Sequence, residues 1–302
     1  MNLFEVIVVD DGSTDDTRTT IREYMQHSKL NLKYVYQEHA GPGVTRNYGI
    51  TQSSGAIVAF LDDDVILRDD CFEHAIAHFA QPDVAVVEAM VLIEGTSEPL
   101  LKYSAVQGFI TNCIFYRKRV LEEIGGFDEA FFDSETGLFF RDDLDLGFRL
   151  LEAGHRAVQP HDVVVWHPMI YNNLKSCFNH ARRYMFDPLL YRKHPKLFRA
   201  QLERKQIGFF SFGRPLHYAS LGYLSFQWLV VILLLMKLPF AAGLAAIVML
   251  VNYFVIRYKY KGRRALRLWN LTETLAYAMF PWYYGYWFVR GCRKFGGWKS
   301  IV

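Results

Sequence analysis

Short apolar runs alternate with helix-like segments over the first hundred residues of the chain. Runs rich in β-branched and aromatic residues predict four strands, at residues 4–9, 32–36, 56–61 and 84–89. Segments with polar starts or an apolar stripe predict helices at residues 15–27, 43–52 and 69–80. In the last of these, Phe72, Ile76 and Phe79 fall on one face. This alternation predicts a mostly parallel, doubly wound α/β sheet.

The pattern changes beyond residue 215. Two stretches, Tyr218–Met236 and Leu238–Ile256, contain no acidic or basic residue, and each has close to the ~20 apolar residues that a helix needs to cross a bilayer. With Lys237 and Pro239 between them, they predict a transmembrane hairpin. The alternative is a buried helical hairpin of a large soluble domain.

Charge is distributed unevenly along the chain, although the formal net charge is only +3. Residues 1–215 are acidic, Lys237 is the only charged residue in 216–256, and Glu273 is the only acid in the basic tail 257–302. These three ranges predict an acidic domain with connecting helices, a membrane hairpin, and a basic tail. Basic residues flank the hairpin at both ends, which predicts a multi-pass membrane protein whose first domain is cytoplasmic. The aromatic stretch Leu268–Val289 is either an interfacial helix or a third span.

Acidic clusters follow two of the predicted strands. Asp10 and Asp11 follow the first, and Asp62, Asp63 and Asp64 follow the third. In open α/β sheets the ligand lies beyond the carboxyl ends of the strands, so we expect these carboxylates at one rim. Hard divalent cations such as Mg²⁺ or Mn²⁺ bind carboxylates together with substrate phosphates. The alternatives are an Asx-turn with a helix cap for the first cluster and a solvated turn for the second.

Six motifs in register resemble glycosyltransferase family 2. They are "EVIVVDDGSTDDT" (Glu5–Thr17), "AGPGVTRNYGI" (Ala40–Ile50), "GAIVAFLDDDV" (Gly55–Val65), "GGFDEAFF" (Gly125–Phe132), "FRDDLDLGFRLLEAGH" (Phe140–His155) and "VVVWHP" (Val163–Pro168). The resemblance implies a GT-A, Rossmann-like fold in which helices cover both faces of a mixed sheet. It also implies transfer of a sugar from a nucleotide-diphosphate donor to an acceptor hydroxyl, with inversion at the anomeric carbon.

The resemblance also implies roles for individual residues. Asp11, with Asp10 beside it, resembles the acid that recognises the nucleotide base, and Arg46 resembles its partner around the nucleotide. The "LDDDV" segment resembles the DxD element, in which Asp62 or Asp63 would meet the ribose side. Asp64, together with Asp62, would hold the metal ion on the diphosphate.

Inversion requires a carboxylate that takes the proton of the acceptor hydroxyl, and we expect Asp143 to be this base. Leu144, Phe148 and Leu151 have helical spacing, which places Asp142 and Asp143 in the first turn of a helix. Two ordinary capping acids are the alternative, because the helix dipole favours carboxylates there. The family commonly has Glu-Asp at these two positions, so this chain departs from the family pattern at Asp142.

Three further features follow from the resemblance. His167 ends a strand at a place where some relatives present a metal-ligating histidine, although a lone histidine is often structural. Asn112 and Asp142 are expected on the acceptor side. Family members usually begin with a further strand and helix, whereas Met1 falls directly before what would be the second strand, so we expect that element to be missing.

The leading hypothesis is therefore a membrane-anchored, metal-dependent inverting glycosyltransferase. A lipid-linked or cell-envelope glycan acceptor at the cytoplasmic membrane face is expected, and no nucleic-acid partner. The first alternative is a non-catalytic nucleotide-sugar-binding or membrane scaffold protein with an incomplete GT-A domain. A nucleotidyltransferase is a second, but the chain has no Gly-rich phosphate loop with an adjacent lysine.

Overall fold

The computed structural model describes residues 4–99, 108–168, 174–207, 210–213, 226–230, 232–237, 240, 242–244, 246–247, 250 and 271–296. The chain separates into two compact units, Met1–Ile170 and Tyr171–Val302, and each is described by itself. The predicted domain boundaries at residues 215 and 256 fall outside the described residues.

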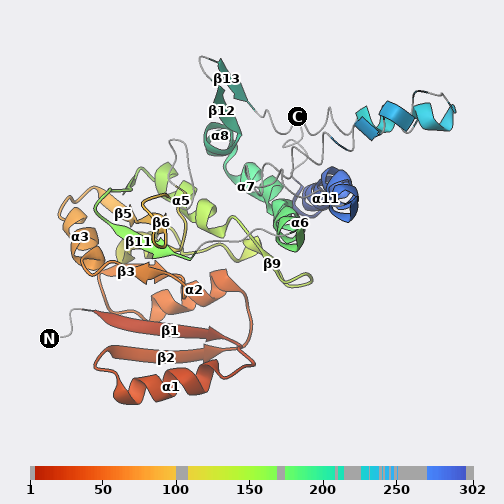
Figure 1. The fold of residues 1–302 in the computed structure, drawn as a ribbon. Coiled ribbons are helices and arrows are strands. Elements are labelled where there is room, and N and C mark those ends of the chain that lie inside the picture. The colour runs from red at the N-terminus through yellow and green to blue at the C-terminus, as the bar shows by residue number, and fades with distance from the viewer. Residues whose placement is uncertain are drawn as a thin grey trace. The chain divides into compact units, whose positions relative to one another are not determined.

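The first unit has a mixed α/β fold (Figure 1). Its strands are β1 (Glu5–Asp11), β2 (Asn31–Gln37), β3 (Ile57–Leu61), β4 (Ile66–Leu67), β5 (Val84–Glu88), β6 (Met90–Ile93), β7 (Cys113–Arg117), β8 (Phe132–Asp133), β9 (Leu138–Phe139), β10 (Arg156–Val158) and β11 (Val164–His167). Its helices are α1 (Thr17–His27), α2 (Pro42–Gln52), α3 (Cys71–His78), α4 (Lys118–Glu123), the 3-10 helix η1 (Glu129–Phe131) and α5 (Asp142–Glu152).

The sheet is mixed and divided, which corrects the expectation of a mostly parallel one. β1 and β2 pair in parallel, a four-stranded sheet has the order β10-β5-β7-β3, and a three-stranded sheet has the order β4-β11-β6. β7 runs antiparallel to both β3 and β5. The expectation failed because the alternation of strands and helices did not reveal this inserted strand. The predicted fourth strand also breaks at Ala89, where the chain passes from one sheet into the next.

A hydrophobic core forms where α3 packs on the strands. Cys71, Ala75 and Phe79 of the α3 segment contact buried residues of β5, β7 and β11. Ile76, predicted on the buried face, is 53% exposed. The reason is that the buried stripe follows the i, i+4, i+8 spacing of Cys71, Ala75 and Phe79. This packing supports the ends of β3 and β11, which carry candidate site residues.

The second unit is mostly helical. It contains α6 (Leu174–Arg183), the 3-10 helix η2 (Tyr184–Phe186), α7 (Asp187–Lys193), α8 (Pro195–Phe198), the π-helix η3 (Arg199–Glu203), β12 (Arg204–Ile207), β13 (Phe210–Gly213) and α11 (Leu271–Phe295). Aromatic pairs join α6 to α11, with the ring of Phe178 centred 5.5 Å from that of Phe280 and 5.0 Å from that of Tyr283. The Arg182 guanidinium also lies 4.9 Å from the ring centre of Trp287.

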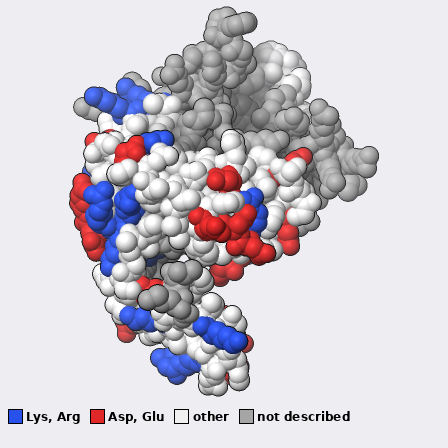
Figure 2. Space-filling view, turned by 90° about the vertical axis from the view of Figure 1, so that its left-hand side faces the viewer, with Lys and Arg blue, Asp and Glu red and all other residues white. Residues whose placement is uncertain are grey.

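The predicted membrane segments are only partly covered by the structure. Residues 218–225 and 251–256 of the expected hairpin lie outside the described residues. Much of the stretch Leu268–Val289 falls within α11. Among the residues that the structure describes, we find no helix with both the length and the hydrophobicity required to cross a bilayer. On the face seen in Figure 2, acidic and basic side chains are interspersed over the described residues.

Candidate functional site

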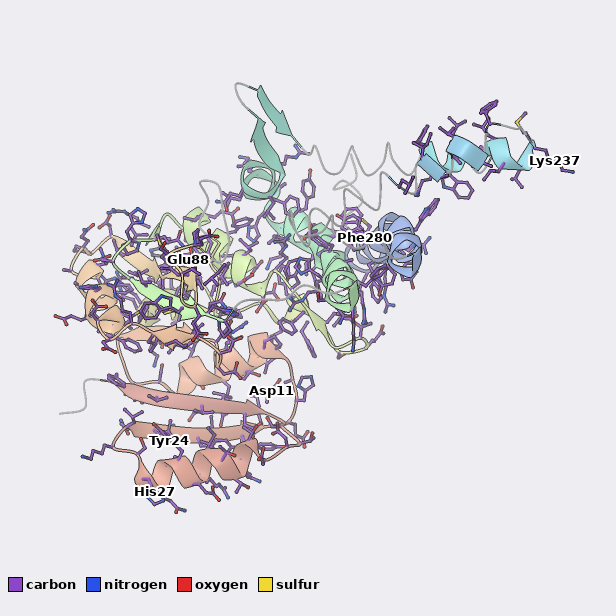
Figure 3. All side chains as sticks on the ribbon, viewed as in Figure 1. Asp11, Tyr24, His27, Glu88, Lys237 and Phe280 are labelled. Atoms are coloured by element: carbon purple, nitrogen blue, oxygen red, sulfur yellow. The ribbon has the colours of Figure 1, made fainter. Side chains whose placement is uncertain are left out.

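Asp11 organises the loop that leads from β2 into α2. Its Oδ1 accepts hydrogen bonds from Gln37 Nε2 at 2.7 Å and from the Ala40 N–H at 2.9 Å. Its Oδ2 accepts from the Gly41 N–H at 3.0 Å and lies 2.9 Å from His39 Nδ1. Desolvation raises the pKa of Asp11, but these hydrogen bonds together lower it below its usual value. Three donors, from Gln37, Ala40 and Gly41, therefore bind the carboxylate of Asp11, which ends β1 (Figure 3). Base recognition by Asp11 stays a prediction.

Asp10 points to the opposite side of β1 and is 4% exposed. It accepts a hydrogen bond from the Ser13 N–H at 2.7 Å and another from the Tyr34 hydroxyl. The bond to Ser13, three residues ahead, corresponds to the turn-stabilising alternative for this acidic cluster. Its role in nucleotide binding is likewise still a prediction.

Arg46 of α2 forms the centre of a second group. Its Nη1 donates to Asp142 Oδ2 at 2.7 Å, and its Nη2 donates to Thr111 Oγ1 at 2.9 Å. The guanidinium also lies 5.3 Å from the ring centre of Phe127. Sequence reasoning assigned Arg46 to the nucleotide and Asp142 to the acceptor side. In the structure the two side chains bind each other, so Asp142 is held by a cation.

Asp62, directly after β3, is tied to Asn112. Asn112 Nδ2 donates to Asp62 Oδ2 at 2.8 Å, and the Asp62 N–H donates to the Asn112 carbonyl at 3.1 Å. Burial is the main cause that raises the pKa of Asp62, with Asp64 and Asp63 adding to the effect and Arg46 opposing it. Asn112, expected on the acceptor side, therefore contacts the predicted nucleotide-binding acid.

Asp64 and His167, which with Asp62 are the three predicted metal ligands, lie close together. His167 Nε2 lies 3.3 Å from Asp64 Oδ2, and its Nδ1 lies 2.7 Å from the Pro168 carbonyl. A hydrogen bond to this carbonyl requires a proton on Nδ1, and Nε2 is the ring nitrogen that faces Asp64. The neighbouring Asp63 is exposed. The described residues contain no group of three or more acids, histidines or cysteines arranged to hold a metal ion by themselves.

Asp143 lies in the first turn of α5, beside the Arg46–Asp142 pair. Desolvation, followed by the negative charge of Asp142, raises the pKa of Asp143 to about 7. The Leu144 N–H, Arg141 and Arg46 oppose this rise. The predicted base therefore has a carboxyl whose ionisation changes near neutral pH, which suits proton transfer.

Thr111, Phe127 and Tyr116 also belong to the surroundings of the site, and sequence reasoning did not assign them roles. Thr111 and Phe127 contact Arg46. Tyr116 is fully buried on β7, and the charges of Glu88 and Asp143 add to the desolvation that raises its pKa. Thr111 directly precedes Asn112, and Phe127 lies in the "GGFDE" motif; this proximity was the only available signal.

Known proteins resemble this chain in both sequence and fold. Residues 1–144 match the sequence profile described as Glycosyl transferase family 2. The pre-mycofactocin glycosyltransferase of Mycobacterium tuberculosis is 31% identical in an alignment 172 residues long, which covers 50% of this chain and 34% of that protein. Glycosyltransferase AglE of Haloferax volcanii is 28% identical over 180 residues, covering 55% of this chain and 57% of that protein. The chain thus spans about a third of the length of the first curated relatives.

The mannosyltransferase PcManGT from Pyrobaculum calidifontis, solved in complex with GDP-Man and Mn2+, shares the fold. It matches with a TM-score of 0.62 at 20% identity, over 94% of this chain and 77% of that chain. This similarity confirms the GT-A-like mixed α/β fold. The profile match over residues 1–144 confirms the resemblance to glycosyl transferase family 2 that the sequence motifs indicated.

Proposed function

We propose that the chain is an inverting glycosyltransferase that moves a sugar from a nucleotide-diphosphate donor to an acceptor hydroxyl. The observation that carries the proposal is Asp143, a carboxyl in the first turn of α5 whose pKa is raised to about 7. A base with this pKa is about half ionised near neutral pH and still accepts a proton readily. The family of the amino-terminal domain supports the same reaction class.

In the proposed reaction the acceptor hydroxyl attacks the anomeric carbon, and the nucleotide diphosphate leaves from the opposite face. The hydroxyl proton passes to Asp143 as the new glycosidic bond forms. Arg46 Nη1 holds Asp142 Oδ2 at 2.7 Å, and the negative charge of Asp142 raises the proton affinity of Asp143. Asp62, with Asp63 and Asp64, would face the donor.

A divalent cation fits the donor side of this site. Asp64 Oδ2 and His167 Nε2 approach to 3.3 Å. Metal-ligating histidines commonly place their other ring nitrogen against a backbone carbonyl, and His167 Nδ1 lies 2.7 Å from the Pro168 carbonyl. Such ions are commonly held by one or two protein groups plus substrate phosphates. When bound, Mg²⁺ or Mn²⁺ would stabilise the charge that develops on the leaving diphosphate. The Mn2+ bound in PcManGT supports this choice of metal.

We further propose that the enzyme acts at the cytoplasmic face of a membrane on a lipid-linked or cell-envelope glycan. The support comes from the charge-free stretches 218–236 and 238–256 and from the basic segments that flank them. Anionic headgroups attract such segments by about 1 kcal/mol for each basic residue near the surface. Extraction tests this part: the protein should require detergent, and release by carbonate or high salt alone would contradict it.

A screen of nucleotide-sugars against the purified protein, with release of nucleoside diphosphate as the signal, tests the reaction. We expect release that depends on Mn²⁺ or Mg²⁺. Asp143→Asn should nearly abolish it while donor binding, measured by calorimetry, is retained. Glu152→Gln, an exposed carboxyl on the same helix, is the matched control and should keep wild-type turnover. Binding of a nucleotide-sugar without any turnover would instead favour the non-catalytic alternative.

A further inference from the structure

Glu88 is a buried acid to which the proposed reaction gives no role. It ends β5, which lies between β10 and β7, and it is 4% exposed (Figure 3). Burying a carboxylate is unfavourable unless hydrogen bonds compensate for the lost water. Desolvation raises the pKa of Glu88, and only the backbone N–H groups of Ile110, Phe109 and Gly108 act against it. The segment 108–110 is therefore what stabilises this carboxylate.

The backbone of this segment has an unusual conformation. Phe109 has a φ of 51°, in the left-handed region that bulky residues rarely adopt. Successive N–H groups beside a left-handed residue converge into a concave anion-binding site, called a nest. Glu88 Oε1 accepts a hydrogen bond from the Ile110 N–H at 3.1 Å. The carboxylate thus occupies the nest that the turn creates.

The nest also determines where the Phe109 ring lies. This ring is fully buried, and a Cβ atom built on Gly147 would overlap it. Gly147 lies one helical turn beyond Asp143 on α5. The contact between Phe109 and Gly147 therefore joins the nest to the helix that carries the proposed base.

The residues that follow the nest reach the rest of the site. Thr111 accepts a hydrogen bond from Arg46 at 2.9 Å, and Asn112 donates one to Asp62 at 2.8 Å. A displacement of 108–110 would move both contacts, because Thr111 and Asn112 directly follow the nest in the chain.

We propose that Glu88 is a positioning residue, whose carboxylate accepts hydrogen bonds in the nest at 108–110. The nest in turn holds Phe109 against α5, Thr111 against Arg46, and Asn112 against Asp62. This inference rests on the proposed glycosyl transfer for its effect on turnover. This positioning role requires a hydrogen-bond acceptor at position 88, but not a negative charge.

The surroundings of Glu88 allow substitutions to distinguish the effect of its hydrogen-bond acceptor from the effect of its negative charge. Its second oxygen, Oε2, and the Tyr116 hydroxyl are buried without a hydrogen-bond partner among the described residues. Both side chains lie on one face of the sheet, because Glu88 pairs with Ile114, two residues from Tyr116. A glutamine at position 88 can keep its Oε1 in the nest and direct its amide group toward this side. A methionine keeps the approximate volume but offers no comparable acceptor.

The test compares Glu88→Met and Glu88→Gln by hydrogen–deuterium exchange and by turnover, with Tyr116→Phe as the control on the same sheet face. In Glu88→Met we expect exchange in 108–112 and in the first turns of α5 to rise at least about tenfold, since unsatisfied buried donors favour local opening. Turnover should fall by a similar factor. Glu88→Gln and Tyr116→Phe should stay close to wild type.

Gly147→Ala disturbs the contact between Phe109 and α5 by a change in the helix itself. It provides the test if Glu88→Met does not fold. It should raise exchange in 108–112 while leaving the remainder of the first unit protected. Unchanged exchange in both Glu88→Met and Gly147→Ala would overturn the proposal. So would a Glu88→Gln variant as damaged as Glu88→Met, because charge would then be the requirement. If the wild-type protein transfers no sugar but the exchange pattern appears, the proposed function fails and the anchoring role of Glu88 stands.

Discussion

Arg46 of α2 and Asp142 of α5 form an ion pair, with 2.7 Å between Nη1 and Oδ2, although 96 residues separate them in the chain. The Asp142 side chain is 8% exposed and that of Arg46 21%. Thr111 and the Phe127 ring contact the guanidinium as well. This pair connects α2 to α5 and places the guanidinium of Arg46 and the carboxylate of Asp142 next to Asp143.

Arg46→Met should destabilise the protein strongly, because it leaves the buried Asp142 carboxylate without its cation. Breaking such a pair lowers the free energy of unfolding by about 3–5 kcal/mol, to be measured by denaturant titration. Arg156→Met is the matched control: its ion pair with Asp83 has side chains 52% and 60% exposed, and such surface pairs contribute about 0–1 kcal/mol. Equal losses in the two variants would contradict the importance of burial at Arg46.

The pH dependence of turnover should report the ionisation of Asp143. Only the ionised carboxyl accepts a proton, so kcat/KM should rise with pH through about 7. Asp142→Asn removes a negative neighbour that raises this pKa, while Arg46 continues to lower it. The rising limb should therefore move to lower pH in that variant. A limb at the same pH would show that another group controls it.

The stability of the protein should also depend on the ionisation of Asp143, but it should fall as pH rises, whereas turnover increases. The folded-state pKa of Asp143 is raised above the value of about 3.9 expected in the unfolded chain. Between these two values the folded state binds more protons, so the contribution of Asp143 favours folding at low pH and is lost as pH rises to about 7. The difference between wild type and Asp143→Asn in the free energy of unfolding, followed over this range, isolates that contribution. A constant difference would argue against the raised pKa.

The strand and helix pattern predicted the elements of the first unit better than their pairing. Asp64 follows β3 and His167 ends β11, and the fold brings the two side chains to 3.3 Å, while their role as metal ligands stays a prediction. The partnership of Arg46 with Asp142 was missed, because the motif alone indicates a residue type and not a partner 96 positions away. Glu88 was missed for a related reason. It occurs in an apolar run, and only the left-handed turn at Phe109 reveals what its carboxylate binds.

Asp64→Ala and His167→Ala should each weaken donor binding and reduce its dependence on Mn²⁺, because each removes one of the protein groups proposed to hold the metal with Asp62. Losses of about 10- to 100-fold in metal affinity are typical for changes at such sites. Titration with Mn²⁺ in the presence of UDP or GDP measures them. His155→Ala is the control, because that histidine has a different partner: its Nε2 lies 3.3 Å from Glu123 Oε1. Donor affinity that is the same with and without EDTA would contradict the metal site.

Asn112→Asp should weaken donor binding more than Asn112→Leu does. Asn112 Nδ2 donates to Asp62 Oδ2 at 2.8 Å, and burial already raises the pKa of Asp62. An aspartate there would place a second carboxylate against the first, so the pair would retain a proton to higher pH and repel donor phosphates when fully ionised. Leucine removes the hydrogen bond but adds no charge, and the backbone bond between Asp62 N–H and residue 112 is kept in both variants. Calorimetric titration with UDP and GDP between about pH 6 and 8.5 compares the two variants as the charge of the carboxylates changes with pH. Equal affinities for the two variants across this range would show that the lost hydrogen bond, and not the charge at position 112, governs donor binding.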